Sequence, residues 1–205
     1  MTKAQISLSS AKRRQILNGA RTLFLAKGYE RTSVDAIAAC AGVSKATLYS
    51  HFGDKQGLFV ACATEESADV RARLADLLGA PTGDPARDLT EVGEAFLHLV
   101  ARPSTLAYRR ILVAEAGRFP ELGRTFFDDA SCAIRGRLAN YLRRQGEQGT
   151  LRIEDGDLAA AQFIALCLSD LLWRLELGVL SRVSNALARR TVEGALGTFL
   201  RAYRR

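Results

Sequence analysis

The stretch TSVDAIAACAGVSKATLYSHFGDKQGLF, residues 32–59, decides how the N-terminal part of this chain folds. Its pattern predicts two short helices on either side of a tight turn at Gly42, followed at once by a third helix. A helix-turn-helix of this kind can place its second helix in the major groove of DNA. We therefore expect this part of the chain to bind double-stranded DNA.

Positive charge is concentrated around this motif. Residues 1–55 contain nine Lys or Arg against three Asp or Glu, whereas residues 56–205 contain 20 against 19. Nearly all of the net charge of +7 therefore lies in the first quarter of the chain. A basic segment around a helical motif indicates a polyanionic partner, in agreement with DNA binding.

The whole chain of 205 residues favours helix, because no alternating run of β-branched residues is long enough to predict a strand. We expect an all-α fold of about nine helices. A flexible tail over residues 1–10 precedes a three-helix DNA-binding domain over 11–55. A C-terminal regulatory and dimerisation domain covers 56–205, and a long helix over 55–78 connects the two domains. The turn-rich segment 79–85 is the clearest internal boundary.

Capping and helix-breaking residues locate the helices. Thr32 and Asp35 match the capping-box pattern and are expected to open the second helix. Ser44 and Asp54 are expected to cap the third and fourth helices. The remaining helices are predicted over residues 86–101, 104–117, 121–145, 157–178 and 184–204, with Ser184 as the cap of the last.

Several classes of function are disfavoured by composition. The four cysteines are widely spaced and the chain has two histidines, so we expect no metal site and no other cofactor. One histidine, His51, lies inside the DNA motif, and no catalytic triad or glycine-rich phosphate loop is present, so we do not expect an enzyme. Charged residues interrupt the apolar segment 158–180, so it is expected to be a buried helix and not a membrane span. The N-terminus lacks an apolar export signal, so we expect a cytoplasmic protein.

The outward-facing residues of the third helix are the candidate DNA contacts. Lys45 and Ser50 are placed to reach base edges, whereas the hydroxyls of Thr47 and Tyr49 suit phosphate oxygens. Lys55, at the start of the next helix, can complete a phosphate clamp with the helix dipole. A simply solvated lysine and a tyrosine ring that only covers the core are the plainer interpretations. The other outward positions are Ser44, Ala46 and His51.

The run T-S-V-x-x-I-A-x-x-A-G-V-S-x-x-T-L-Y-x-H-F-x-x-K-x-x-L-F resembles the DNA-binding signature of the tetracycline-repressor (TetR/AcrR) family. The segment RRILVAEAGRFPEL, residues 109–122, is similar to the regulatory domain of one branch of that family. Ala46 and Ser50 are small where some members carry bulkier groups, so a base preference does not carry over. The resemblance implies repression and contacts with operator DNA through Ser33, Lys45, Thr47, Tyr49, His51 and Lys55.

A single motif of this size binds DNA weakly, so we expect a homodimer that reads a palindrome. The helix over 157–178 is apolar on nearly all sides and the helix over 184–204 has an apolar face. A second copy is expected to cover them, although both can also serve as the core of one domain. The expected dimer interface consists of Phe163, Leu166, Leu171, Leu187, Val192, Leu196 and Phe199.

The region between the motif and these helices is the expected sensor for a small apolar effector. An effector that tilts the helix over 55–78 would change the separation of the two recognition helices. A coupling of about 1–3 kcal/mol is sufficient to weaken operator binding 5- to 150-fold. The candidate pocket residues, each of which can also be ordinary core or surface, are Phe96, Tyr108, Ile111, Glu115, Phe119, Phe127 and Trp173.

Two alternatives to an effector-released repressor remain open. Oxidation of Cys40 or Cys62 could disturb the motif and give a redox-responsive regulator, although a buried cysteine more often acts as a small apolar residue. The chain could also bind DNA without responding to any small molecule.

Overall fold

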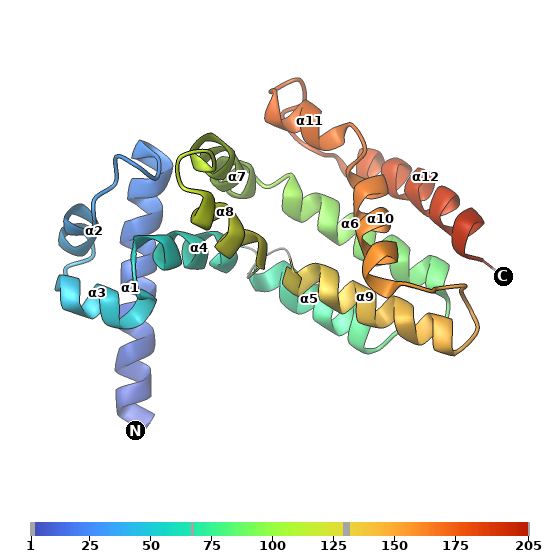
Figure 1. The fold of residues 1–205 in the computed structure, drawn as a ribbon, viewed down its shortest axis with the longest axis horizontal. Coiled ribbons are helices and arrows are strands. Elements are labelled where there is room, and N and C mark those ends of the chain that lie inside the picture. The colour runs from blue at the N-terminus through green and yellow to red at the C-terminus, as the bar shows by residue number, and fades with distance from the viewer. Residues whose placement is uncertain (1–2, 67, 129–131, 205) are drawn as a thin grey trace. The chain divides into compact units, whose positions relative to one another are not determined.

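The computed structural model describes residues 3–66, 68–128 and 132–204. Within these ranges it contains twelve helices and no strand, apart from an isolated bridge between Leu151 and Arg204 (Figure 1). The predicted all-α class is confirmed. No helix in the same ranges has both the length and the apolarity needed to cross a bilayer. The chain divides into two compact units, each with a core of its own.

The N-terminal unit combines two separate parts of the chain, up to Glu66 and from Ala107 onward as far as residue 130. Phe24, Ile37, Leu48 and Phe59 are fully buried at its centre. Tyr108 and Leu122 join this core from the second part, so the unit is larger than the motif alone. Its helices are α1 (Lys3–Lys27), α2 (Val34–Cys40), α3 (Lys45–Phe52), α4 (Lys55–Glu65), most of α7 (Pro103–Glu115) and α8 (Pro120–Phe126).

Helix α1 begins at Lys3, whereas a flexible tail was expected over residues 1–10. The sequence from Lys3 to Ser10 contains neither proline nor glycine. Adding turns to a helix that already exists avoids the cost of a new nucleus, so the helix over 11–27 extends backwards. Residues 1 and 2 lie outside the described part of the chain.

The start of α2 differs from the predicted capping box. Ser33 is the N-cap, and its Oγ accepts a hydrogen bond from the backbone N–H of Ala36 at 3.1 Å. Thr32 is fully buried, and its hydroxyl is 2.7 Å from the carbonyl oxygen of Gly28 and 3.2 Å from that of Leu23. Thr32 therefore bonds to a carbonyl of α1 and to that of the residue after it, instead of capping α2.

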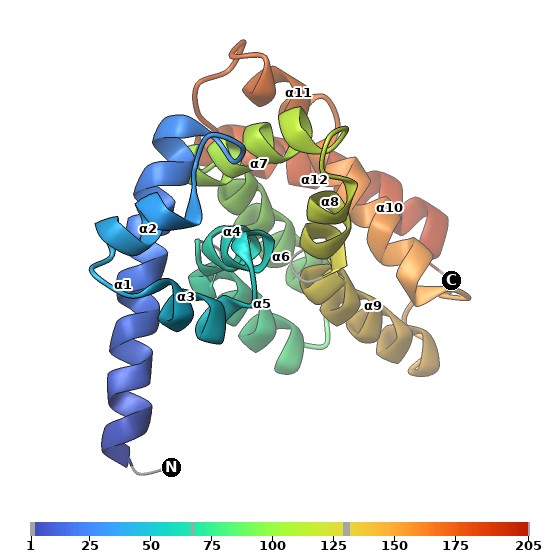
Figure 2. The ribbon, with the colours of Figure 1, turned by 60° about the vertical axis from the view of Figure 1, so that its left-hand side comes forward.

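The C-terminal unit comprises residues 67–106 and 131–205. Helices α6 and α12 pack against each other and both contact α10, while α5 and α9 lie alongside one another (Figure 2). Tyr141, Phe163, Val192 and Phe199 are among its fully buried side chains. Its helices are α5 (Ala68–Gly79), α6 (Pro85–Val100), α9 (Cys132–Glu147), α10 (Gly156–Leu168), α11 (Leu171–Glu176) and α12 (Asn185–Tyr203).

Breaks in three predicted helices raise the number from about nine to twelve. Ser169, with φ of +41°, ends α10, so the helix expected over 157–178 becomes α10 and α11. The helix expected over 55–78 becomes α4 and α5, with residue 67 outside the described ranges. The helix expected over 121–145 is replaced by α8 and α9, and residues 129–131 between them also lie outside those ranges.

A buried carboxylate fixes the start of α6. Asp88 accepts hydrogen bonds from the backbone N–H and the hydroxyl of Thr82 at 3.0 and 2.7 Å, and from the Tyr141 hydroxyl at 2.9 Å. Burial, followed by the nearby Asp88, raises the pKa of Tyr141 well above its ordinary value. The Tyr141 hydroxyl therefore stays neutral and donates to Asp88, which joins α9 to α6.

Candidate nucleic-acid interface

Helices α2 and α3 form the predicted helix-turn-helix. Gly42 adopts φ of +59° in the turn, a conformation that glycine reaches without steric cost. The backbone N–H of Val43 then donates to the carbonyl of Ala38 at 3.0 Å. Ser44 caps α3 as predicted, accepting a hydrogen bond from the N–H of Thr47 at 3.1 Å. The turn thus presents the first residues of α3 at the surface.

Most of the predicted contact residues lie on α3 or at its N-cap, whereas Ser33 caps α2 and Lys55 begins α4. Leu48 is fully buried and attaches the helix to the core, which leaves the opposite side open. Thr47, His51 and Lys55 are half-buried. The exposed members of the predicted set are Ser33, Ser44, Lys45, Ala46, Tyr49 and Ser50.

Lys45 has an acidic neighbour that sequence analysis did not identify. Its Nζ lies 2.5 Å from Oδ1 of Asp35 on α2, and both side chains are more than half exposed. An exposed pair of this kind contributes little to stability. It does hold the amine of Lys45 beside α2, and an approaching phosphate or base edge must compete with the carboxylate for it.

Three hydroxyls on α3 and at its N-cap already form hydrogen bonds within this element. Ser44 and Thr47 share a hydrogen bond of 2.8 Å between their hydroxyl oxygens. The Ser50 hydroxyl donates to the carbonyl of Thr47 at 2.8 Å. Each hydroxyl oxygen retains capacity to accept a further hydrogen bond. The exposed Tyr49 hydroxyl has no partner among the hydrogen bonds described.

Lys55 packs against the turn that follows α1. Its Nζ lies 4.4 Å from the centre of the Tyr29 ring and donates to the carbonyl of Glu30 at 3.2 Å. Burial lowers the pKa of Lys55, while the carboxylates of Glu115 and Glu30 act in the opposite direction. This amine therefore orders the start of α4, in addition to any contact it makes with phosphate.

The segment from Ala107 to Asp128, which we call the docking segment, is bound to the motif by polar contacts. Nε2 of Gln56 donates to the carbonyl of Glu121 at 3.0 Å and to the hydroxyl of Thr125 at 2.7 Å. The N–H of Glu30 donates to Glu115 at 3.2 Å, and the Glu30 carboxylate pairs with Arg118. These partners are more than 60 positions apart in sequence, so no local pattern could have indicated them.

Aromatic rings continue the same connection through the core. Phe59 lies edge-on to Phe24, Tyr29 and Tyr108, with ring centres 5.1–5.4 Å apart. Phe119 reaches Tyr29 at 5.3 Å. Such contacts favour a fixed relative orientation of the rings. The docking segment and the motif therefore share one packed aromatic core.

The predicted effector residues fall in both units. Tyr108 is buried in the core of the N-terminal unit, and Ile111 and Phe119 pack against that core. The Glu115 carboxylate accepts a hydrogen bond from the backbone N–H of Glu30. Phe127 is half exposed. In the C-terminal unit, Trp173 is 66% exposed.

Phe96, also in the C-terminal unit, lines a small apolar cavity of about 10 Å³ between α5, α6, α9 and α10. A cavity of this size holds about one water molecule. The other residues that line it are Leu74, Leu78, Val92, Ile134, Leu138, Phe163 and Ile164.

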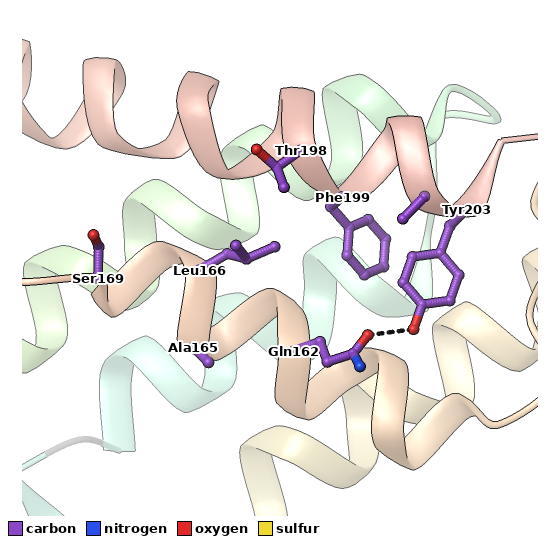
Figure 3. Close-up of a pocket in the computed structure, with 8 residues that line it drawn as sticks. Gln162, Ala165, Leu166, Ser169, Thr198, Phe199 and Tyr203 are labelled. Atoms are coloured by element: carbon purple, nitrogen blue, oxygen red, sulfur yellow. Dashed lines mark hydrogen bonds between the residues drawn. The ribbon is translucent and has the colours of Figure 1, made fainter.

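The predicted dimer residues divide into core and surface. Phe163, Leu171, Val192 and Phe199 are at most 3% exposed, so they pack within the single chain. Leu166, Leu187 and Leu196 are half-buried and pack at the edge of that core. Leu166 lines a largely apolar groove of about 440 Å³ between α10 and α12, where Tyr203 is hydrogen-bonded to Gln162 (Figure 3).

The cysteines differ in their surroundings. Cys40 is exposed, whereas Cys62 is buried beside Tyr108 with its Sγ 3.7 Å from the carbonyl of Leu17. Burial raises the pKa of Cys62 to about 12. A thiol in that state is a poor nucleophile, which disfavours Cys62 as a redox sensor. Among the described residues, no group of three metal-ligating side chains is present.

Two family models cover most of the chain. Residues 16–62 match the model for bacterial regulatory proteins of the tetR family. Residues 87–205 match the model for the C-terminal domain of AefR-like transcriptional repressors.

Individual proteins show the same similarity over their full length. The HTH-type transcriptional repressor Rv1474c of Mycobacterium tuberculosis is 29% identical over 92% of this chain and 100% of its own. A crystal structure of a protein from Mesorhizobium loti, assigned to the TetR-family transcriptional regulators, superposes with a TM-score of 0.82 at 25% identity, with full coverage of both chains. The flavonoid-responsive regulator FrrA gives a TM-score of 0.79 at 31% identity, over 95% of this chain and 98% of its own.

Proposed function

Because the chain belongs to the TetR family of bacterial regulatory proteins, we propose that it is a cytoplasmic transcriptional repressor that binds a palindromic operator as a homodimer and is released by a small apolar effector. The proposal includes no catalytic activity and no cofactor. Its main support is the exposed face of α3, which carries Lys45 and Tyr49 at the solvent side of a rigidly packed motif.

In the proposed complex, α3 lies in the major groove. Lys45 and Ser50 contact base edges, and Ser33, Thr47 and Tyr49 contact phosphate oxygens. Ser44, Ala46 and His51 complete the buried face against DNA. Lys55 contributes positive charge near a phosphate while it supports the turn after α1. The lysines and arginines of residues 1–55 supply the salt-dependent part of the affinity.

The groove between α10 and α12 and the exposed residues that follow it support dimerisation. Trp173, Leu177 and Val179 are each 66–71% exposed on and after α11. Large apolar side chains clustered at a surface indicate an interaction site. We propose that a second copy covers these residues together with Leu166, Leu187 and Leu196. Phe163, Leu171, Val192 and Phe199 would support the interface from below.

The apolar cavity beside Phe96 is the proposed place for the effector. At about 10 Å³ it must expand by rearrangement of the surrounding side chains before it can hold a small molecule. The response of FrrA to flavonoids, as its name states, makes flavonoids and related planar phenols the first compounds to test. Phe96→Ala enlarges the cavity and should change effector affinity without altering operator affinity.

We propose two routes by which the effector signal reaches the motif. One is the junction of α4 and α5, and the other is the docking segment that holds Gln56 and Glu30. An effector that prefers one arrangement of the C-terminal unit would shift these attachments and hence the position of α3. A differential affinity of about 1–3 kcal/mol is sufficient for this response.

The experiment that tests the proposal is selection of bound sequences from a random duplex library, with Lys45→Ala as the matched variant. Enrichment of a palindrome by the wild type, with weaker or relaxed selection by the variant, is the expected result. Light scattering of the purified protein should give the mass of two chains. Weak binding without sequence preference, or a monomer that still selects single half-sites, would contradict the proposal.

A further inference from the structure

A second cavity, polar and rich in arginine, lies on the C-terminal unit and shares no lining residue with the apolar one. It measures about 380 Å³, within the usual size range of small-molecule sites. Its walls come from α5, α6, the residues after α6, and the start of α12. The polar side chains that line it are Arg73, Glu94, His98, Arg102, Asn185 and Arg189.

The charge of this cavity is unusual for its surroundings. Basic and acidic residues are nearly balanced from residue 56 onward, at 20 against 19. The cavity nevertheless gathers three arginines around one carboxylate, that of Glu94. Guanidinium groups that line one cavity give it a positive potential, which favours an anionic ligand.

One ion pair of the cavity joins Arg189 to Glu94 and leaves the Arg189 side chain largely exposed. Nε of Arg189 lies 3.5 Å from Oε1 of Glu94, and the Arg189 side chain is 70% exposed. That contact uses Nε and not the terminal nitrogens, which are the donors that grip a carboxylate or phosphate in a fork. Glu94 is 30% exposed and orients the guanidinium at the rim.

From this arrangement we propose that the cavity is a binding site for a small organic dianion bearing carboxylate or phosphate groups. Arg73, Arg102 and Arg189 bind the anionic groups, and Asn185 and His98 supply further polar contacts. Because the arginines come from separate elements, a bound dianion bridges α5, the residues after α6, and α12. This site is distinct from the apolar effector cavity and does not depend on operator binding.

Calorimetric titration of the full-length protein with inorganic pyrophosphate and, separately, with succinate tests the proposal at low salt. One or both probes should bind the wild type with a Kd below about 1 mM. Arg73→Gln and Arg189→Gln should each weaken binding about tenfold or more, the loss of one charge-assisted contact. The adjacent Arg190→Gln is the matched control and should bind like the wild type. Lys45→Ala should also bind the probes like the wild type, which would show that the DNA surface is not where they bind.

Glu94→Gln provides a test in the opposite direction. Removal of the competing carboxylate should tighten binding several-fold, a gain that a misfolded variant cannot give. A preference for pyrophosphate over succinate, or the reverse, identifies the anionic group that the site takes. The proposal is overturned if neither probe binds the wild type, if Arg73→Gln and Arg189→Gln bind as well as Arg190→Gln does, or if Glu94→Gln binds more weakly.

Discussion

The ammonium group of Lys45, at the start of the recognition helix, lies 2.5 Å from the carboxylate of Asp35 on the preceding helix. The most prominent cation of the proposed DNA surface is therefore already paired in the free protein. DNA binding must break or share this pair. The carboxylate also places a negative charge beside the expected path of the phosphate backbone.

Replacement of Asp35 by Asn should consequently strengthen DNA binding. We expect the affinity for DNA to increase about two- to tenfold. Binding then no longer has to break an exposed ion pair, and one charge that repels phosphate is removed. Fluorescence anisotropy with a labelled operator duplex, measured over a range of salt concentrations, provides the check. An equal or lower affinity for Asp35→Asn would show that the carboxylate positions Lys45 productively.

The docking segment supplies a separate prediction about signal transmission. Gln56→Ala removes both hydrogen bonds to α8, while Thr125→Val removes one and preserves side-chain shape. Both variants should bind the operator within about threefold of the wild type, because neither residue lies on α3. Their response to effector should be weakened, with a coupling loss of about 0.5–2 kcal/mol. Operator titrations with and without effector measure this difference, and unchanged coupling in both variants would exclude this route.

How far the sequence predicted the structure depended on the range of the interactions. Ser44, Asp54 and Ser184 were identified as helix caps because a cap is bonded to residues two or three positions away, and all three are confirmed. Thr32 satisfied the same local pattern. Its hydroxyl nevertheless bonds to the carbonyls of Leu23 in the preceding helix and of Gly28 just after it, because it is buried there.

The periodicity of apolar residues could not predict contacts between distant parts of the chain. The apolar pattern of residues 157–178 indicated burial on nearly all sides. It could not separate Phe163, which packs inside the chain, from Leu166, which lines the groove. Likewise, nothing around Gln56 indicated a partner on α8, since Thr125 is 69 positions away. The arginine cavity was missed for the same reason, because its walls come from distant segments.

Close packing between α6 and α12 gives a stability prediction. A Cβ added to Gly93 would lie 2.9 Å from Cγ1 of Val192 and 3.4 Å from the Sγ of Cys167. Gly93→Ala should therefore destabilise the protein by about 1–3 kcal/mol. The control is Gly136→Ala on α9, where an added Cβ meets no atom within 4 Å. Alanine has the higher helix propensity, so the stability of this variant should equal or exceed that of the wild type. Urea unfolding at one protein concentration compares the two, and equal stability of both variants would contradict the packing account.

Thiol accessibility tests the redox alternative. Cys40 is exposed, whereas Cys62 and Cys167 are buried. Iodoacetamide at pH 8 should therefore modify Cys40 in the native protein, while Cys62 and Cys167 react only after unfolding. Peptide mass spectrometry with time resolves the sites individually. Rapid native modification of Cys62, accompanied by loss of operator binding, would restore the redox interpretation.

The same buried thiols predict how stability depends on pH. Burial raises the pKa of both Cys62 and Cys167 from 9.0 to about 12. Between these values the unfolded chain has released protons that the native chain still holds, so a rise in pH favours unfolding. The contribution of each thiol to stability should be constant below about pH 8 and should fall above pH 9 by up to about 1.4 kcal/mol per pH unit.

Cys167→Ala isolates one of these contributions. The variant loses packing at every pH, but its stability should fall less steeply than that of the wild type between pH 9 and 10. Cys40→Ala, at an exposed position, should retain the wild-type slope. Urea unfolding at pH 8, 9, 9.5 and 10, with protein concentration held constant, measures all three slopes. If Cys167→Ala and the wild type lose stability in parallel over this range, the native thiol at this position ionises as readily as the unfolded one.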